Sequence, residues 1–381
     1  MRNAYVLAVV FFVPAKAGEV IIPEPTGGNW QWSLSAGPAA RNVGNLKVNS
    51  GYRSSGFVLP SLVGNETSAI PSIGSASALA DRQYDDGYVR QDAGTSLDGL
   101  TWNWGYDDAT QVQGGQLVFS ATGSRSARRD SLTASAFGPA RSESLRGIAP
   151  HIQLDGVSPH EIGGFRIGMS AGFDFTQVDQ SLVFSNFAAL QTRDDYRVDY
   201  TDSYDLNGVI APIAPYAGAP GGPGPLIGNL PTSRVVTETL VNTESAFVSN
   251  LVDTAIDIDV FSLTFGPSLS RTHGRFGYGI QGGVILNVYH WEARQNEQLG
   301  ATTATGSSTL AAWDESDSGT KFRPGVFAQG DITCRLNDEV SVGAYVRLDV
   351  ATEFRAQAGP TVYKIDPTGF STGLMIRYEL P

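Results

Sequence analysis

Residues 340–350 read Val340-Ser341-Val342-Gly343-Ala344-Tyr345-Val346-Arg347-Leu348-Asp349-Val350. Valine, alanine and leucine occupy every second position, and Ser, Gly, Tyr, Arg and Asp fill the positions between them. Successive side chains of a β-strand point to opposite faces, so this alternation predicts a strand with one apolar and one polar face.

The preceding stretch, residues 322–336, alternates in the same way and predicts a hairpin partner. Leu336 and Val340 both belong to apolar faces, so an odd number of residues must separate them. Residues 337–339 then form a three-residue loop, in which Asn or Asp can adopt positive φ. The resulting register places Gln329 opposite Arg347 and Asp331 opposite Tyr345.

A second pair of alternating stretches, residues 261–269 and 276–288, lies upstream. His273-Gly274 stands between them and suits a two-residue type I′ turn. Ile256, Ile258 and Val260 have the opposite phase to Phe261, which predicts a β-bulge near Val260.

The remaining alternating stretches are residues 30–38, 116–121, 131–137, 164–176 and 181–204. They predict strands that begin near residues 30, 115, 131, 163, 181, 256, 275, 321, 339 and 370. That makes ten strands within a range of eight to twelve. Short connections are expected at 122–130, 176–180, 273–274 and 337–339, and long loops at 41–112, 205–255 and 296–319. We expect residues 234–242 to form a ribbon that projects from the outer loop and pairs with residues 193–204.

The two faces of these strands distinguish a membrane barrel from a soluble sandwich. The apolar faces are long, and the polar faces combine Arg, Asp, Gln and Gly, which is typical of a crowded barrel interior. Aromatic residues gather near the strand ends, with Trp30, Trp32 and Tyr378 at one edge and Tyr289 and Trp291 at the other. We therefore predict an all-β, closed antiparallel transmembrane β-barrel. Its candidate lumen-lining residues are Arg166, Asp174, Arg193, Asp195, Arg197, Asp199, Gln329, Asp331, Arg335, Tyr345, Arg347 and Asp349.

Both termini carry features of an exported protein. Residues 1–17 combine a short positive start, an apolar run from Ala4 to Val13 and Ala15-Lys16-Ala17, which predicts a cleaved signal peptide. Residues 18–381 then form a single barrel domain. The C-terminal stretch Ser371-Thr372-Gly373-Leu374-Met375-Ile376-Arg377-Tyr378 resembles the terminal β-signal of bacterial outer-membrane β-barrel proteins. This resemblance implies a Gram-negative outer membrane, contact with its lipid, and recognition of the C-terminal strand by the barrel-assembly machinery.

Composition narrows the partners. The chain has 26 basic and 38 acidic residues and a net charge of −12. An acidic chain is a poor match for the phosphates of nucleic acid, so no nucleic-acid partner is expected. Cys334 is the only cysteine and therefore has no intrachain disulfide partner. The oligomeric state is left open.

Few motifs carry chemistry. Gly168-Met169-Ser170-Ala171-Gly172 matches the nucleophile-elbow pattern, but it lies within an alternating strand rather than at a strand-to-helix turn. The histidines lack paired ligand spacing. Asp81, Asp85, Asp86 and Asp92 are weak calcium candidates, because Asp86 stands where the EF-hand pattern requires Gly. We expect neither a catalytic site nor a cofactor.

These observations favour a non-enzymatic outer-membrane barrel, a structural or surface protein with an occluded or narrow polar lumen, and leave slow passage of small solutes open. Two alternatives remain. The first is an outer-membrane lipid-modifying enzyme that uses Ser170, and the second is an exported soluble β-sandwich adhesin.

Overall fold

A computed structural model describes residues 28–92, 99–134 and 140–381, so the predicted signal peptide lies outside the described residues. Within these ranges the regular structure is antiparallel β-sheet with two short 3-10 turns, η1 (Ser54–Gly56) and η2 (Ala109–Gln111). No helix in the described residues is long and apolar enough to cross a membrane.

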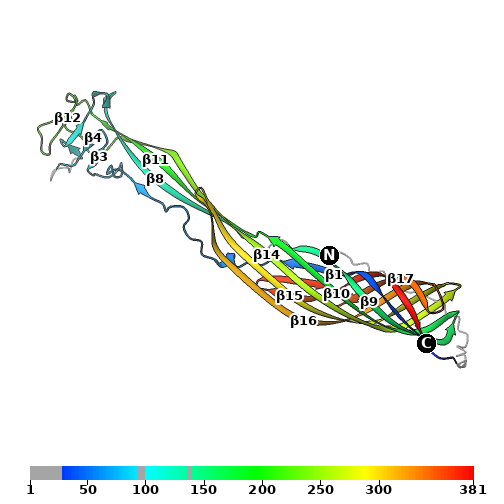
Figure 1. The fold of residues 1–381 in the computed structure, drawn as a ribbon. Helices are drawn as coiled ribbons and strands as arrows, with labels where there is room; N and C mark the ends of the chain where they lie inside the picture. Colours follow the sequence, from blue (N-terminus) through cyan, green and yellow to red (C-terminus); the bar gives the residue numbers. More distant parts are fainter. Residues whose placement is uncertain (1–27, 93–98, 135–139) are drawn as a thin grey trace, which may run out of the picture.

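Eight strands close into a ring (Figure 1). In spatial order β10, β9, β1, β20, β17, β16, β15 and β14 are neighbours, and β14 pairs with β10 to complete the circle. Their bounds are β1 (Gln31–Asn49), β9 (Arg141–Ile162), β10 (Phe165–Phe184), β14 (Ser233–His273), β15 (Phe276–Thr303), β16 (Gly306–Arg335), β17 (Val340–Ala351) and β20 (Gly369–Leu380). These pairings form one closed ring. A soluble sandwich would instead require two stacked sheets.

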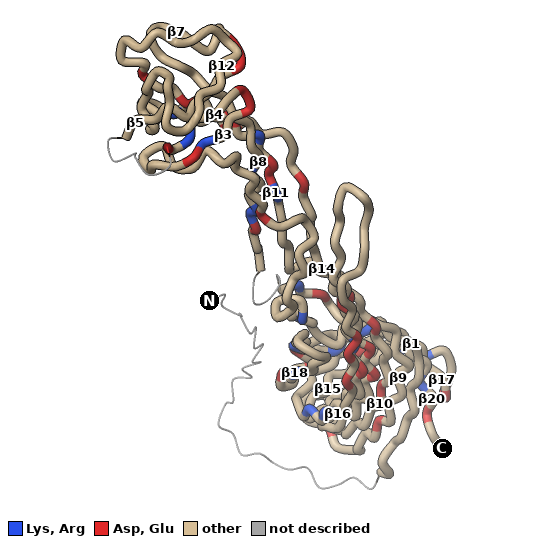
Figure 2. Tube along the Cα trace, turned by 90° about the vertical axis from the view of Figure 1, so that its left-hand side faces the viewer, with Lys and Arg blue, Asp and Glu red and all other residues tan. Residues whose placement is uncertain are grey.

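A three-stranded ribbon, which we name the stalk, leaves one end of the ring (Figures 1 and 2). It consists of β8 (Gln116–Ala134), β11 (Phe187–Asp205) and the first part of β14. The pairing of β11 with β14 runs from Ser203↔Ser233 to Ala188↔Ser249. The prediction that residues 234–242 pair with residues 193–204 in a projecting ribbon is therefore confirmed.

The stalk ends in a small head, formed by the described residues of 70–119 together with 202–232. Its short strands are β3 (Arg82–Tyr84), β4 (Gly87–Val89), β5 (Leu100–Thr101), β6 (Trp104–Tyr106), β7 (Val112–Gln113), β12 (Tyr216–Ala217) and β13 (Ile227–Gly228), while β2 (Ser68–Ala69) pairs with β8 in the stalk. Trp104, Leu117, Phe119 and Tyr204 are fully buried in its core. These residues give the head a hydrophobic core separate from that of the ring.

A buried polar cluster fastens the head to the stalk. The Tyr84 hydroxyl donates to Asp202 Oδ2 at 2.5 Å and lies 2.7 Å from the Tyr204 hydroxyl. Arg234 donates to both oxygens of Asp202, at 2.6 and 2.7 Å. Burial raises the pKa of Tyr204 to about 12 and also raises the pKa of Tyr84.

Several predicted strands differ from those observed. Residues 116–121 and 131–137 were expected to form a hairpin across 122–130, but residues 116–134 are one continuous strand, β8, and it lies in the stalk. The predicted turn at 176–180 is wrong, because β10 continues to Phe184 and the break falls at residues 185–186. Strand β9 was missed. The best estimate of ten ring strands therefore becomes eight, at the edge of the predicted range.

Parts of the predicted long loops are strand, although residues 50–112 contain only short strands in the described part of the chain. Residues 41–49 belong to β1, residues 233–255 to β14, and residues 296–319 mostly to the β15–β16 hairpin. Polar composition suggested loops there, whereas a hairpin standing in solvent can satisfy its backbone by pairing while its side chains stay polar.

The predicted register is confirmed in one hairpin, although no residue of its loop 337–339 has positive φ, and the predicted turn of the other hairpin is wrong. The register of β16 with β17 is as predicted, with Gln329↔Arg347 and Asp331↔Tyr345. In the β14–β15 hairpin, His273 pairs with Phe276, so the turn residues are Gly274 and Arg275. Only Gly274 has positive φ, at 60°, which excludes the expected type I′ turn because that turn needs positive φ at both positions.

Candidate functional site in the ring interior

The outer wall of the ring is apolar on all eight strands. The exposed large side chains include Leu34, Ile152, Phe173, Leu263, Ile280, Val326, Val346 and Leu374, one for each strand. On the expected aromatic edge, Trp30, Trp32 and Tyr378 are 42%, 38% and 42% exposed. A continuous apolar belt of this kind marks a surface that meets a non-aqueous phase or a partner.

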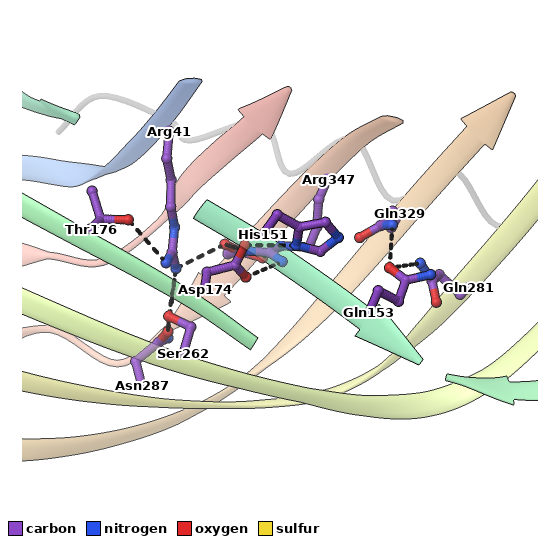
Figure 3. Close-up of polar contacts among 11 residues, drawn as sticks. Arg41, His151, Gln153, Asp174, Thr176, Ser262, Gln281, Asn287, Gln329 and Arg347 are labelled. Carbon is purple, nitrogen blue, oxygen red and sulfur yellow. Dashed lines mark hydrogen bonds and ion pairs between the residues drawn. The ribbon is translucent and has the colours of Figure 1, made fainter. Parts of the chain in front are cut away.

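The inner wall at the same level is polar and buried. Arg347 on β17 donates to Asp174 Oδ2 on β10 at 2.5 Å and, through Nε, to Asp349 Oδ1 at 2.9 Å (Figure 3). His151 Nδ1 on β9 lies 2.8 Å from the other oxygen of Asp174. The side chains of His151, Asp174 and Arg347 have no exposed surface.

Arg41 on β1 extends this network across the ring. Its Nη2 donates to Ser262 Oγ at 2.7 Å and lies 3.4 Å from Asp349 Oδ2. Asn287 Oδ1 accepts from both Ser262 and Arg41. Two arginines and two aspartates thus neutralise one another, which buried charge requires.

A second polar layer lies beside the first. Gln153 Oε1 accepts from Gln281 and Gln329, each at 2.9 Å (Figure 3). Arg377 lies 3.0 Å from Asp155 and 3.6 Å from Asp331. Toward the short turns this layer borders a polar cavity of about 380 Å³.

The stalk end of the interior is closed by apolar packing. The hairpin of β18 (Phe354–Ala358) and β19 (Thr361–Asp366) buries Phe354, Tyr363 and Ile365 against the inner wall. Residues 50–56, which we name the strap, are held beside them by Glu297. Its buried carboxylate accepts from the backbone N–H groups of Arg53 and Ser54 and from the Ser54 hydroxyl.

This packing explains why the predicted bulge near Val260 is wrong. Strand β14 pairs without interruption through Val260 on both sides. Ile256, Ile258 and Val260 point inward into the apolar plug, so the inner face itself changes from polar to apolar. Tyr289 and Trp291 also point inward, at 1% and 5% exposure, and do not form the second outer aromatic edge that the sequence predicted.

The twelve candidate lumen residues divide into three groups. Asp174, Gln329, Tyr345, Arg347 and Asp349 lie buried inside the ring, and the partly buried Asp331 lies at the border of the cavity. Arg166 and Arg335 line the cavity near the short turns. The other four are a correction: Arg193, Asp195, Arg197 and Asp199 lie on β11 in the stalk, where Arg193–Asp195 and Arg197–Asp199 form partly exposed ion pairs.

The sequence reasoning missed interior residues whose strands it had not recognised. His151, Gln153 and Asp155 belong to β9. Arg41 falls at the start of the predicted loop 41–112, although it alternates in phase with Ser33 and Ser35 of β1. This shared phase was the one sequence signal that Arg41 faces the ring interior.

Ser170 and the four calcium candidates have ordinary structural contacts. Ser170 lies within β10, and its buried Oγ is 3.5 Å from the carbonyl oxygen of Gly266. Asp81, Asp85, Asp86 and Asp92 each accept a backbone N–H. Across the described residues no group of three or more His, Cys, Asp or Glu side chains is placed to hold a metal ion.

Comparisons with known proteins add little. No family model matches the chain, and no curated protein matches it. Two solved forms of OmpT, an outer membrane protein of Vibrio cholerae, align over 70% and 71% of this chain and over 100% and 99% of their own chains. Identity is 9% for the mutant that lacks loop L8 and 10% for the other form, and both TM-scores are 0.11. The weak structural neighbours are thus outer-membrane proteins, but a likeness of this size carries no argument.

Proposed function

We propose that this protein is a non-enzymatic outer-membrane β-barrel that anchors a rigid stalk and head outside the cell. The observation that carries the proposal is a reversal of the inside and outside chemistry of the ring at one level. Below that level the outer face is apolar and the inner face polar, and directly above it the outer face becomes polar and the inner face mostly apolar.

Strand β14 displays the reversal. Phe261, Leu263 and Phe265 point outward, whereas the next outward residues toward the stalk are Asp259 and Asp257. The paired positions on β10 change at the same level, since Phe175 faces Phe261 and Gln177 faces Asp259. On β15 the outward side chain changes from Val288 opposite Phe261 to His290 opposite Asp259.

A lipid boundary accounts for a switch shared by neighbouring strands. The outer wall of β14 is apolar from Phe261 to Leu269. A tilted membrane-spanning strand needs about 9–11 residues, which this segment and its flanks supply. In water beyond the boundary, the ring keeps its fold by burying apolar side chains inside, as soluble proteins do.

The closed interior favours an anchor over a pore. Arg347 and Asp174 fill the middle of the ring as a buried ion pair, and the apolar plug closes the stalk end. Eight strands leave an interior just wide enough for side chains. Short turns at one end and the stalk at the other agree with periplasmic turns and extracellular extensions.

The test uses intact cells that express the full chain. Added protease should cleave the head without permeabilising the cells, and unheated detergent extracts should migrate differently from heated ones. Recovery of the mature chain in a detergent-free soluble fraction would refute the membrane proposal. Planar-bilayer recording should show no discrete conductance steps, and steps would replace the anchor with a pore.

A further inference from the structure

The head carries two isoleucines that its own fold leaves uncovered. Ile210 and Ile213 are 89% and 94% exposed. The most exposed apolar residue on the outer wall of the ring, Ile148, reaches 79%. Burying an isoleucine side chain stabilises a protein by about 1.5–3 kcal/mol, and each of these two residues lacks that contribution. Their exposure therefore needs a reason.

The loop that carries them is held in one shape. Val209, Ala211 and Ala214 pack against the head core, so the intervening isoleucines face away from it. The Val209 N–H donates to the Leu206 carbonyl at 2.8 Å, and the Tyr106 hydroxyl donates to the Pro212 carbonyl. The loop leads directly into β12, at the end of the head farthest from the ring (Figure 1). A fixed loop binds at a lower entropic cost than a flexible one.

The surroundings of this apolar tip are acidic. Asp107 and Asp108 follow Tyr106, and Asp205 begins the turn that leads into the loop; all three are exposed. The only basic residues of the described head are Arg82 and Arg90. Arg82 is buried and donates to backbone carbonyls, and Arg90 stacks on Tyr88 and donates to Gln83. With two arginines against eight aspartates, the described head carries a net negative charge.

We propose that Ile210 and Ile213 dock into an apolar pocket rimmed by lysine or arginine on a partner protein. The acidic tip repels an anionic lipid surface and also repels a second copy of this chain, whose net charge is −12. Exposed apolar residues with acidic residues on the adjoining segments match the usual arrangement of an anchor residue with a polar rim. The inference rests on the proposed function, because it requires the head to face outward.

The experiment selects a phage-displayed library of random dodecapeptides on the detergent-solubilised full chain. The matched control is Val58→Ser, because Val58 is 88% exposed but lies next to Phe57 and Leu59, which pack on the ring core. Enriched peptides should combine apolar residues with Lys or Arg. Their affinity should fall ~100-fold in the Ile210→Ser, Ile213→Ser double variant and stay unchanged in the control, since burial of each isoleucine accounts for roughly tenfold.

Charge supplies an independent readout. Asp107→Lys should weaken the same peptides several-fold, and added salt should weaken them in the parent protein. Peptides that bind the double variant as well as the parent would overturn the proposal. If the head bound phosphatidylcholine vesicles in a flotation assay only when Ile210 and Ile213 were present, the partner would be a lipid surface and not a protein. Because the selection needs no membrane, its failure is distinguishable from failure of the protease test on intact cells.

Discussion

Replacing Arg347 with methionine tests whether the ring interior is sealed. The guanidinium contacts Asp174 at 2.5 Å and Asp349 at 2.9 Å, and these three side chains are at most 4% exposed. After the change, Asp174 keeps His151 at 2.8 Å, and Asp349 keeps only Arg41 at 3.4 Å. Removing one partner of a buried ion pair costs about 3–5 kcal/mol, because an uncompensated charge stays out of water.

The matched control is Arg294→Met on the same ring. Arg294 pairs with Asp257 at 3.3 Å and with Glu292 at 3.4 Å, but its side chain is 58% exposed. Such surface pairs contribute about 0–1 kcal/mol. Urea unfolding in phospholipid vesicles, followed by tryptophan fluorescence, measures both variants. If the two unfolded at the same urea concentration, the interior charges would be hydrated, and the sealed lumen would be wrong.

Three further changes test other parts of the molecule. Phe265→Arg on the outer wall should cost about 2–4 kcal/mol in the same vesicles, whereas Phe247→Arg, outward on the same strand but beyond the reversal, should change stability by less than about 0.5 kcal/mol. Glu297→Ala should leave backbone N–H groups of the strap unpaired, so proteolysis within residues 50–56 should accelerate while the heat-dependent gel shift persists. The pKa values of Tyr84 and Tyr204 in the folded head lie above the ordinary value of about 10, so the unfolded head releases these protons first as the pH rises. The head should therefore lose stability between about pH 10 and 12. It should become protease-sensitive in this range while the ring stays folded.

Local alternation was enough to predict the hairpin of β16 and β17. Parity alone fixed which residues oppose each other, because a shift of one residue would turn every apolar side chain to the polar face. Gln329↔Arg347 and Asp331↔Tyr345 follow from it without any knowledge of the rest of the chain. The same rule identified Asp174 and Asp349 as inward residues.

Strand β9 was missed because its pattern is interrupted by proline. Pro150 lacks the N–H that a ladder needs, and proline within an alternating run argues against a central strand. The structure places Pro150 directly opposite Pro38 of β1, between two otherwise regular stretches of pairing. His151 belongs to the first polar layer and Gln153 to the second. Neither could be assigned to the ring interior without that strand.

Strand ends were missed for a different reason, and β14 makes it clear. This strand has 41 residues and crosses three surroundings: the stalk, the plugged end of the ring and the apolar belt. From Ala246 near the end of the stalk to Thr264 in the ring, its even-numbered residues point inward. Only the chemistry of that face changes, from mostly apolar above the reversal to polar below it. Periodicity shows which residues share a face, but it cannot show whether lipid, water or the protein interior covers that face. The change in surroundings near Val260 therefore looked like a change in the alternation and led to the predicted bulge.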